Sequence, residues 1–174
     1  MPMDALIRLD GNCLLWIQDN LRQDFWTPFW TGITSLGDKG WFWIALALLL
    51  AVFPRTRRVG LLALAAMIAC ALVTNVCLKN LVARPRPYTQ VSGLAALIPP
   101  PSDWSFPSGH ATASFASAGV YLRTLPRRYG IAALILAVLV AFSRLYVGVH
   151  YPTDVIIGTA IGLLGSQIVC RITR

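Results

Sequence analysis

The sequence contains no glutamate and few charged residues of any kind. Charged side chains make up 13% of the 174 residues, about half of the roughly 25% that is typical of soluble domains. Apolar residues make up 56%, and the mean hydropathy is +0.63. This composition excludes an ordinary soluble domain and predicts a helical membrane protein in which residues 1–174 form one domain.

Histidine and cysteine are also scarce, which limits the possible metal sites. The chain has two histidines and four cysteines, and no two cysteines have the CxxC spacing of a metal or redox motif. The cysteines lie in apolar or amphipathic stretches, as small buried hydrophobic residues do: Cys13, Cys70, Cys77 and Cys170. Two histidines without an acidic cluster are too few for a zinc site, so we predict no metal and no other cofactor.

The excess positive charge, +8 at neutral pH, lies at the ends of the apolar segments. A nucleic-acid-binding protein would instead gather its basic residues on one face. Anchoring at a membrane surface and binding of phosphate explain this distribution better. We therefore expect membrane lipids as partners and no nucleic acid, and no obligate protein partner is indicated.

Two short helices are expected before the first long apolar segment. Residues 25–36 predict an aromatic-rich helix that is too short to cross a membrane unaided, followed by a turn. Residues 3–22 predict an amphipathic helix in the membrane interface, with one stripe formed by Leu6, Leu9, Cys13, Ile17 and Leu21. We assign residues 1–36 to these interfacial helices and residues 40–174 to a helix bundle.

The bundle is expected to contain four or five membrane-spanning segments. They are residues 40–54, 59–78, 109–122, 129–149 and 153–170. The second is an unbroken apolar run of 20 residues, the length that a helix needs to cross a hydrocarbon core of roughly 30 Å. Together with the interfacial helix, these segments predict an all-α, polytopic membrane helix bundle of about five to six helices.

Arginine clusters in the connections predict the orientation of the bundle. The clusters are Arg55, Arg57 and Arg58; Arg123, Arg127 and Arg128; and Arg171 and Arg174. Because successive helices alternate in direction, all three clusters fall on one side, which the positive-inside rule places in the cytoplasm. The ionisable residues at the other helix ends then lie on the extracytoplasmic side of a multi-pass protein of the cell membrane.

Ionisable residues at membrane depth are costly unless they face a polar cavity, so by default they mark a functional site. One such pair lies at the start of the last helix. His150 and Asp154 are four residues apart, a spacing that shares one helix face, and Pro152 suits the first turn. Asp154 can accept a hydrogen bond from one ring nitrogen of His150 and leave the other nitrogen free as a nucleophile. A neutral imidazole that attacks phosphorus becomes a cationic phosphohistidine, which the carboxylate would stabilise.

The segment Pro107-Ser108-Gly109-His110 begins another helix. Gly109 lets the backbone approach an anion closely, and Ser108 can cap the helix, whose first N–H groups attract phosphate. His110 lies in the first turn, where it can protonate a leaving oxygen. One histidine as nucleophile and one as acid provide the two roles that catalysis near neutral pH requires.

Three basic residues complete the candidate site. Lys79 ends a long apolar helix, Arg86 follows in the extended segment Arg84-Pro85-Arg86-Pro87, and Arg144 follows Ser143 near the end of a later helix. These cations would surround the phosphoryl oxygens and provide the charge stabilisation that magnesium provides elsewhere. The sequence therefore predicts phosphoryl transfer that does not depend on a metal.

Together these positions resemble the three-part signature of the type 2 phosphatidic acid phosphatase family, which is related to vanadium haloperoxidases. The resemblance extends from about residue 55 to the C-terminus and is carried by Lys79, Arg86-Pro87, Pro107-Ser108-Gly109-His110, Ser143-Arg144, His150 and Asp154. A haloperoxidase is disfavoured, because those relatives are soluble.

The resemblance implies a helical bundle with an extracytoplasmic site, in which His150 is the nucleophile, Asp154 orients it and His110 is the acid. It implies that phosphate is bound by Lys79, Arg86, Ser108, Gly109 and Arg144. Arg84 lies outside the signature, and we expect it to be accessory at best.

The implied substrate is a lipid phosphate, but the signature does not separate diphosphates from monophosphates. Small bacterial members resemble undecaprenyl diphosphate phosphatases, whereas other members act on phosphatidylglycerol phosphate, phosphatidate, diacylglycerol diphosphate or lipid A. We favour undecaprenyl diphosphate. The alternative from another class is a non-catalytic lipid-binding or transport protein on the same scaffold, which should have lost one of the two histidines. The apolar loop at residues 84–107 could either enter the lipid surface or pack on its own bundle.

Overall fold

The computed structural model describes the backbone of residues 2–173 and the side chains of residues 7–173. Over this range the chain is helical, without a strand, as the sequence predicts. The elements are α1 (Pro2–Leu21), α2 (Thr27–Leu36), η1 (Asp38–Gly40), α3 (Trp41–Val52), α4 (Arg57–Ala71), η2 (Leu72–Leu78), α5 (Lys79–Val82), α6 (Pro87–Gln90), α7 (Gly109–Thr124), α8 (Arg127–Tyr146) and α9 (Pro152–Ile172). The elements η2 and α5 continue α4, and η2 is a π-helical segment.

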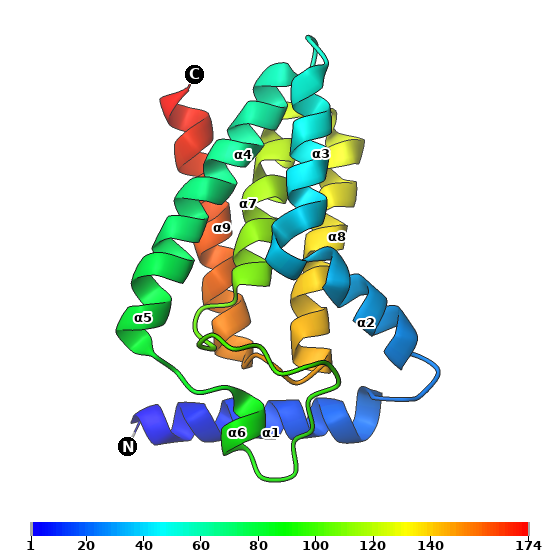
Figure 1. Ribbon diagram of the computed structural model, residues 1–174, viewed down its shortest axis with the longest axis vertical. Coiled ribbons are helices and arrows are strands. Elements are labelled where there is room, and N and C mark those ends of the chain that lie inside the picture. The colour runs from blue at the N-terminus through cyan, green and yellow to red at the C-terminus, as the bar shows by residue number, and fades with distance from the viewer. Residues whose placement is uncertain (1, 174) are drawn as a thin grey trace.

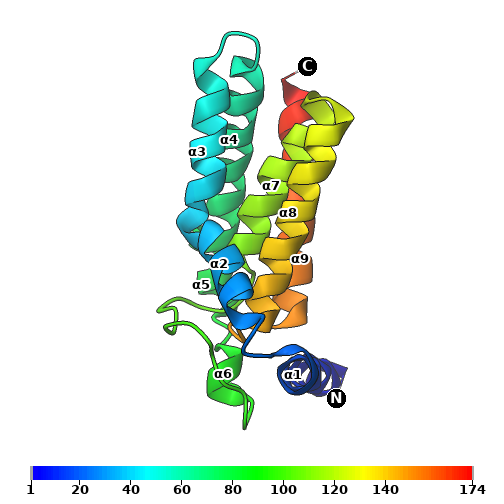
Figure 2. The same cartoon turned by 90° about the vertical axis from the view of Figure 1, so that its right-hand side faces the viewer.

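Helices α3, α4, α7, α8 and α9 stand side by side in the bundle, and α1 lies across one end of it (Figure 1). A view from the side shows α1 end-on beneath α8 and α9, with α6 and its loop beside it (Figure 2). The connections α3–α4 and α7–α8 and the C-terminus, which carry the basic clusters, lie together at the opposite end (Figure 1). This arrangement agrees with the predicted grouping of those clusters.

The central helix is α7, which packs against α4, α8 and α9. It has 16 residues, and ten of them are buried, including several serine, threonine and alanine residues. Small residues let the helices approach closely: a Cβ atom on Gly162 of α9 would lie 2.6 Å from the carbonyl oxygen of Thr112. Because neighbouring helices surround it, α7 needs neither the length nor the apolar surface of a helix that faces lipid.

Three helical segments in the described chain are long and apolar enough to cross a membrane: Arg57–Gln90, Arg127–Tyr146 and Pro152–Ile172. A fourth candidate consists of α2 together with η1 and α3, which are bent by 45° at the break between them. The segment predicted at residues 40–54 is thus the 12-residue helix α3, and the short helix predicted at residues 25–36 is α2.

Helix α1 confirms the predicted N-terminal helix. Asp10, Leu14 and Ile17 are buried, whereas Leu9, Cys13 and Leu21 of the predicted apolar stripe are exposed, so the buried face shares Ile17 with that stripe. Leu6 lies outside the described side chains. On the buried face, Asp10 pairs with Arg84, which is half-buried.

The loop between α6 and α7 packs largely on the protein. Leu94 is buried against Leu14 of α1 and Tyr151, and Leu97 and Ile98 pack against the turn that connects α8 to α9. This favours the second of the two roles considered for the apolar loop. Trp104 remains exposed.

Candidate active site

One cavity of about 920 Å³ reaches from the α5–α7 end of the bundle to the surfaces of α3 and α4. Its polar end is lined by six of the eight predicted site residues: Lys79, Arg86, Gly109, His110, Arg144 and His150. Its other walls include the apolar side chains of Ile44, Leu64, Met67 and Ile68. Ser108 and Asp154 are fully buried outside the lining, behind Gly109 and His150 respectively.

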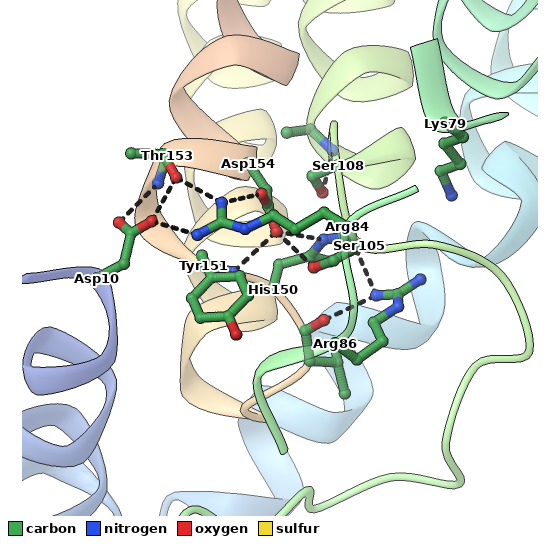
Figure 3. A network of polar contacts seen from close by, with 12 residues as sticks. Asp10, Lys79, Arg84, Arg86, Ser105, Ser108, His150, Tyr151, Thr153 and Asp154 are labelled. Carbon is green, nitrogen blue, oxygen red and sulfur yellow. Dashed lines mark hydrogen bonds and ion pairs between the residues drawn. The ribbon is translucent and has the colours of Figure 1, made fainter. Parts of the chain in front are cut away.

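Asp154 lies in the first turn of α9, and its carboxylate is held by several donors (Figure 3). One oxygen, Oδ2, accepts from the backbone N–H of Tyr151 at 3.0 Å and from the hydroxyl of Ser105. The same oxygen lies 3.5 Å from Nδ1 of His150, which has no hydrogen-bond partner within the described residues. The predicted hydrogen bond between the two side chains is therefore a longer contact here, since Oδ2 already accepts two bonds.

The other ring nitrogen of His150, Nε2, lies 3.0 Å from Nη1 of Arg86. A guanidinium group can only donate, so Nε2 accepts and the ring proton is on Nδ1, facing Asp154. Burial of the ring, and then the charges of Arg86 and Arg144, lower the pKa of His150 well below its ordinary value. The side chain is therefore a neutral imidazole with a lone pair on Nε2, the state that a nucleophile requires.

His110 follows the N-terminal cap of α7, where the hydroxyl of Ser108 accepts from the backbone N–H of Ala111 at 3.4 Å. Its Nε2 lies 3.0 Å from Oδ1 of Asp38 in η1. Because a carboxylate can only accept, Nε2 carries a proton. Gly37 allows this approach, since a Cβ atom there would lie 2.4 Å from the His110 ring.

Three cations face the cavity, and each is held by a different set of partners. Lys79 and Arg86 both form ion pairs with Asp103, which lies on the loop before α7. Arg144 donates from Nη1 to the hydroxyl of Thr34 in α2 at 2.6 Å, and its buried Nε has no partner among the described residues. Arg144 therefore has an unused N–H donor, which suits an anion in the cavity.

Asp103 contributes a carboxylate to the site, and the sequence gives no indication of this role. Partial burial alone would raise its pKa, but hydrogen bonds and charges from Lys79 and Arg86 lower the pKa of Asp103 to about 2. The side chain is thus an anion at any ordinary pH. It neutralises the two cations that the sequence assigns to phosphate binding, and at 53% exposure it lies at the mouth of the site.

Proteins with a similar sequence or structure identify the family to which this site belongs. Residues 60–174 match the profile of the PAP2 superfamily. The chain belongs to the PAP2 superfamily. An undecaprenyl-diphosphatase of Sulfolobus acidocaldarius is 42% identical over 130 residues, which are 75% of this chain and 61% of that protein. The chain therefore spans less than two thirds of this relative's length.

Two further PAP2 relatives extend the comparison. Decaprenylphosphoryl-5-phosphoribose phosphatase of Mycobacterium tuberculosis is 39% identical over 141 residues, covering 79% of this chain and 75% of that protein. The crystal structure of a transmembrane PAP2-type phosphatidylglycerolphosphate phosphatase from Bacillus subtilis superposes with a TM-score of 0.81 at 30% identity, covering 97% of this chain and 86% of that one. With its long apolar helices, this PAP2 chain is a multi-pass membrane protein.

The PAP2 signature omits several charged residues that the structure brings to the site. Asp38 and Asp103 contact His110 and the cations, respectively, and Arg84 contacts Asp154 directly at 2.6 Å. Arg84 was expected to be accessory at best because it lies outside the signature, but its contact with Asp154 joins residues 70 positions apart.

Proposed function

We propose that this chain is an integral-membrane lipid phosphatase that removes a terminal phosphate through a phosphohistidine on His150. The observation that carries the proposal is the shared cavity, which is lined by two imidazoles and three cations and also by apolar side chains of α3 and α4. A phosphoryl group would occupy the polar end, and an acyl or prenyl chain would extend along α3 and α4. The PAP2 relatives are named as phosphatases of lipid phosphates, which supports this assignment.

In the first step, Nε2 of His150 attacks the terminal phosphorus, and its bond to the leaving-group oxygen breaks; this is the bridging oxygen of a diphosphate or the lipid oxygen of a monophosphate. The leaving oxygen takes the proton from Nε2 of His110, which faces the same cavity and acts as the doubly protonated imidazolium, so that His110 becomes neutral. The Asp154 carboxylate, 3.5 Å from Nδ1, stabilises the positive charge that forms on the ring. In the second step, a water molecule gives a proton to His110 and attacks phosphorus, which releases phosphate and restores His150.

The cations stabilise charge on the phosphoryl oxygens throughout. Lys79, Arg86 and Arg144 would contact these oxygens, with the first N–H groups of α7 at Gly109. The substrate phosphate would replace the Asp103 carboxylate on Lys79 and Arg86, and it would draw Arg86 away from Nε2 of His150. Binding would thereby expose the nucleophile only when a phosphate is present.

Among lipid phosphates we propose undecaprenyl diphosphate as the substrate, at the extracytoplasmic face of the cell membrane. The name of the Sulfolobus relative supports the substrate, and the basic connections at the other end of the bundle support the orientation. Phosphatidylglycerophosphate or phosphatidate is the alternative, supported by the similarity to the Bacillus phosphatase. A panel of lipid phosphates tests the choice: undecaprenyl diphosphate should have a kcat/KM at least about tenfold above the others. A higher value for phosphatidylglycerophosphate would overturn it, and no phosphate release from any lipid would favour a non-catalytic lipid-binding or transport protein.

Inhibition by vanadate without dependence on a metal is a further expectation. Vanadate adopts the trigonal-bipyramidal geometry of phosphoryl transfer, so it should compete with the lipid phosphate for the three cations and Nε2 of His150.

EDTA should leave turnover unchanged, because within residues 7–173 no three histidine, cysteine or acidic side chains gather as metal ligands. Steady-state phosphate release with each reagent checks both points. Loss of turnover in EDTA that magnesium restores would contradict the metal-free mechanism.

A further inference from the structure

A chain of charged side chains connects α1 to the candidate nucleophile through Asp154 (Figure 3). Arg84, in the extended segment after α5, donates from Nη1 to Oδ1 of Asp154 at 2.6 Å. From Nη2 the same guanidinium donates to Oδ2 of Asp10 at 2.8 Å. Asp154 in turn faces His150, so this series of side-chain contacts connects a helix on the surface of the bundle with the proposed nucleophile.

The position of Arg84 is fixed on several sides. Its guanidinium carbon lies 3.7 Å from the centre of the Tyr151 ring, and Nη1 also donates to the hydroxyl of Thr153 at 2.7 Å. The two carboxylates that it joins are almost completely buried, with Asp10 exposed by 2% and Asp154 fully buried. A buried carboxylate is costly without a compensating cation, so Arg84 is the group that makes an ionised Asp154 tolerable here.

Asp10 reaches the same place from α1. Its carboxylate accepts from the backbone N–H of Thr153 at 3.2 Å and from the Thr153 hydroxyl, in addition to Arg84. Asp10 therefore contacts the first turn of α9, one residue before Asp154 in sequence. Asp10, Arg84 and Asp154 together carry one net negative charge, so Asp154 keeps its ability to stabilise a cationic ring although an arginine is bound to it.

We propose that Arg84 and Asp10 are positioning residues of the active site, and that α1 is therefore part of the catalytic unit. Arg84 fixes the rotation of the Asp154 carboxylate by holding Oδ1, which leaves Oδ2 directed at Nδ1 of His150. Asp10 holds Arg84 and offsets its charge. The proposal rests on the phosphatase function proposed above, because it assigns these residues a role in the same reaction.

A purely structural role for the contacts of Arg84 and Asp10 would lead to a different expected result. Other residues also attach α1 to the bundle without contacting Asp154: Arg22 donates to the carbonyl oxygens of Tyr146 and Ala95, each at 2.7 Å. If Arg84 and Asp10 only fastened α1, replacing Arg22 should be about as harmful as replacing Arg84. If they position Asp154, only Arg84 and Asp10 should affect the chemical step.

The test uses purified full-length protein and measures kcat and KM for release of phosphate from a lipid phosphate. Arg84→Met and Asp10→Asn should each lower kcat about 10- to 100-fold, as loss of an outer partner of a catalytic group does, with little change in KM. Arg84→Lys should recover part of the loss, because it keeps the positive charge but not the two guanidinium nitrogens that bind both carboxylates. Arg22→Met is the matched control and should retain kcat within about threefold.

A double-mutant cycle separates positioning from structure. In an Asp154→Asn background, Arg84→Met should lower kcat by less than about threefold, because the group that Arg84 holds has already been changed. A full additional loss in that background, or unchanged kcat in Arg84→Met and Asp10→Asn, would overturn the proposal while the phosphatase function stands. If Arg84→Met does not fold, the isosteric Asp10→Asn decides alone. Absence of phosphate release by the wild-type protein would overturn both proposals.

Discussion

Replacement of His150 with alanine is expected to lower phosphate release at least about 10⁴-fold, since removal of a nucleophile from an enzyme with a covalent intermediate has an effect of this size. His150 is the side chain in the cavity whose ring nitrogen is neutral, accepts a hydrogen bond and faces the cations. The measurement is kcat under saturating lipid phosphate, with size-exclusion chromatography to show that the variant remains folded.

Binding provides the control for this variant. Lys79 and Arg144 remain in His150→Ala, so an inert lipid phosphate analogue should still bind, although vanadate should lose the bond to Nε2. A variant that keeps most of the wild-type turnover would rule out His150 as nucleophile. Retained biological function without any turnover would instead favour the non-catalytic lipid-binding or transport protein.

Replacement of His110 with asparagine is expected to lower kcat for a lipid phosphate about 10²- to 10⁴-fold, with a smaller effect on KM. The reason is the proton on Nε2, which His110 shares with Asp38 at 3.0 Å and which a lipid alkoxide or phosphate leaving group needs. An activated substrate, such as a nitrophenyl phosphate, has a leaving group that needs no proton. For that substrate the first step should be nearly unaffected in the variant.

The ratio of the two losses is the decisive quantity for His110. In the first step, measured as the pre-steady-state release of the leaving group, a general acid gives a large loss with the lipid phosphate and a small loss with the activated ester, each relative to wild type. Equal losses with both substrates would mean that His110 binds or orients the phosphoryl group without supplying a proton. The same comparison in Arg144→Ala is the control, because a phosphate-binding cation should affect both substrates alike.

Much of the site could be predicted from sequence because its members stand at the ends of apolar segments. Lys79, His110, Arg144 and His150 each lie where a helix of the bundle begins or ends, and helices that alternate in direction bring those ends together. Small residues in α7 explain why this helix is central although it is short.

The residues that sequence reasoning missed are charged residues whose partners are distant in the chain. Asp10 pairs across 74 positions with Arg84, and Asp38 contacts His110 across 72. No periodicity or local spacing connects such residues, and a lone aspartate in an N-terminal helix or a turn has the pattern of an ordinary surface residue. For the same reason, the sequence did not indicate that Asp10 would be buried against the bundle.

Two details of the predicted site also depend on packing that the sequence does not encode locally. Asp154 was expected to accept a hydrogen bond from His150, but its Oδ2 is taken by Ser105 and the backbone of Tyr151. Ser108 caps α7 as predicted, but its hydroxyl does not line the cavity. Its role in phosphate binding stays a prediction.

The most direct measurement is capture of the phosphorylated enzyme. The His110→Asn variant should transfer phosphate from an activated ester to the protein but hydrolyse the intermediate slowly, because the second step lacks its base. Rapid quenching in alkali and mass spectrometry of the peptides should then locate an acid-labile phosphate on His150. Product formed in a single turnover without a phosphorylated histidine, or with the phosphate on another residue, would contradict the account.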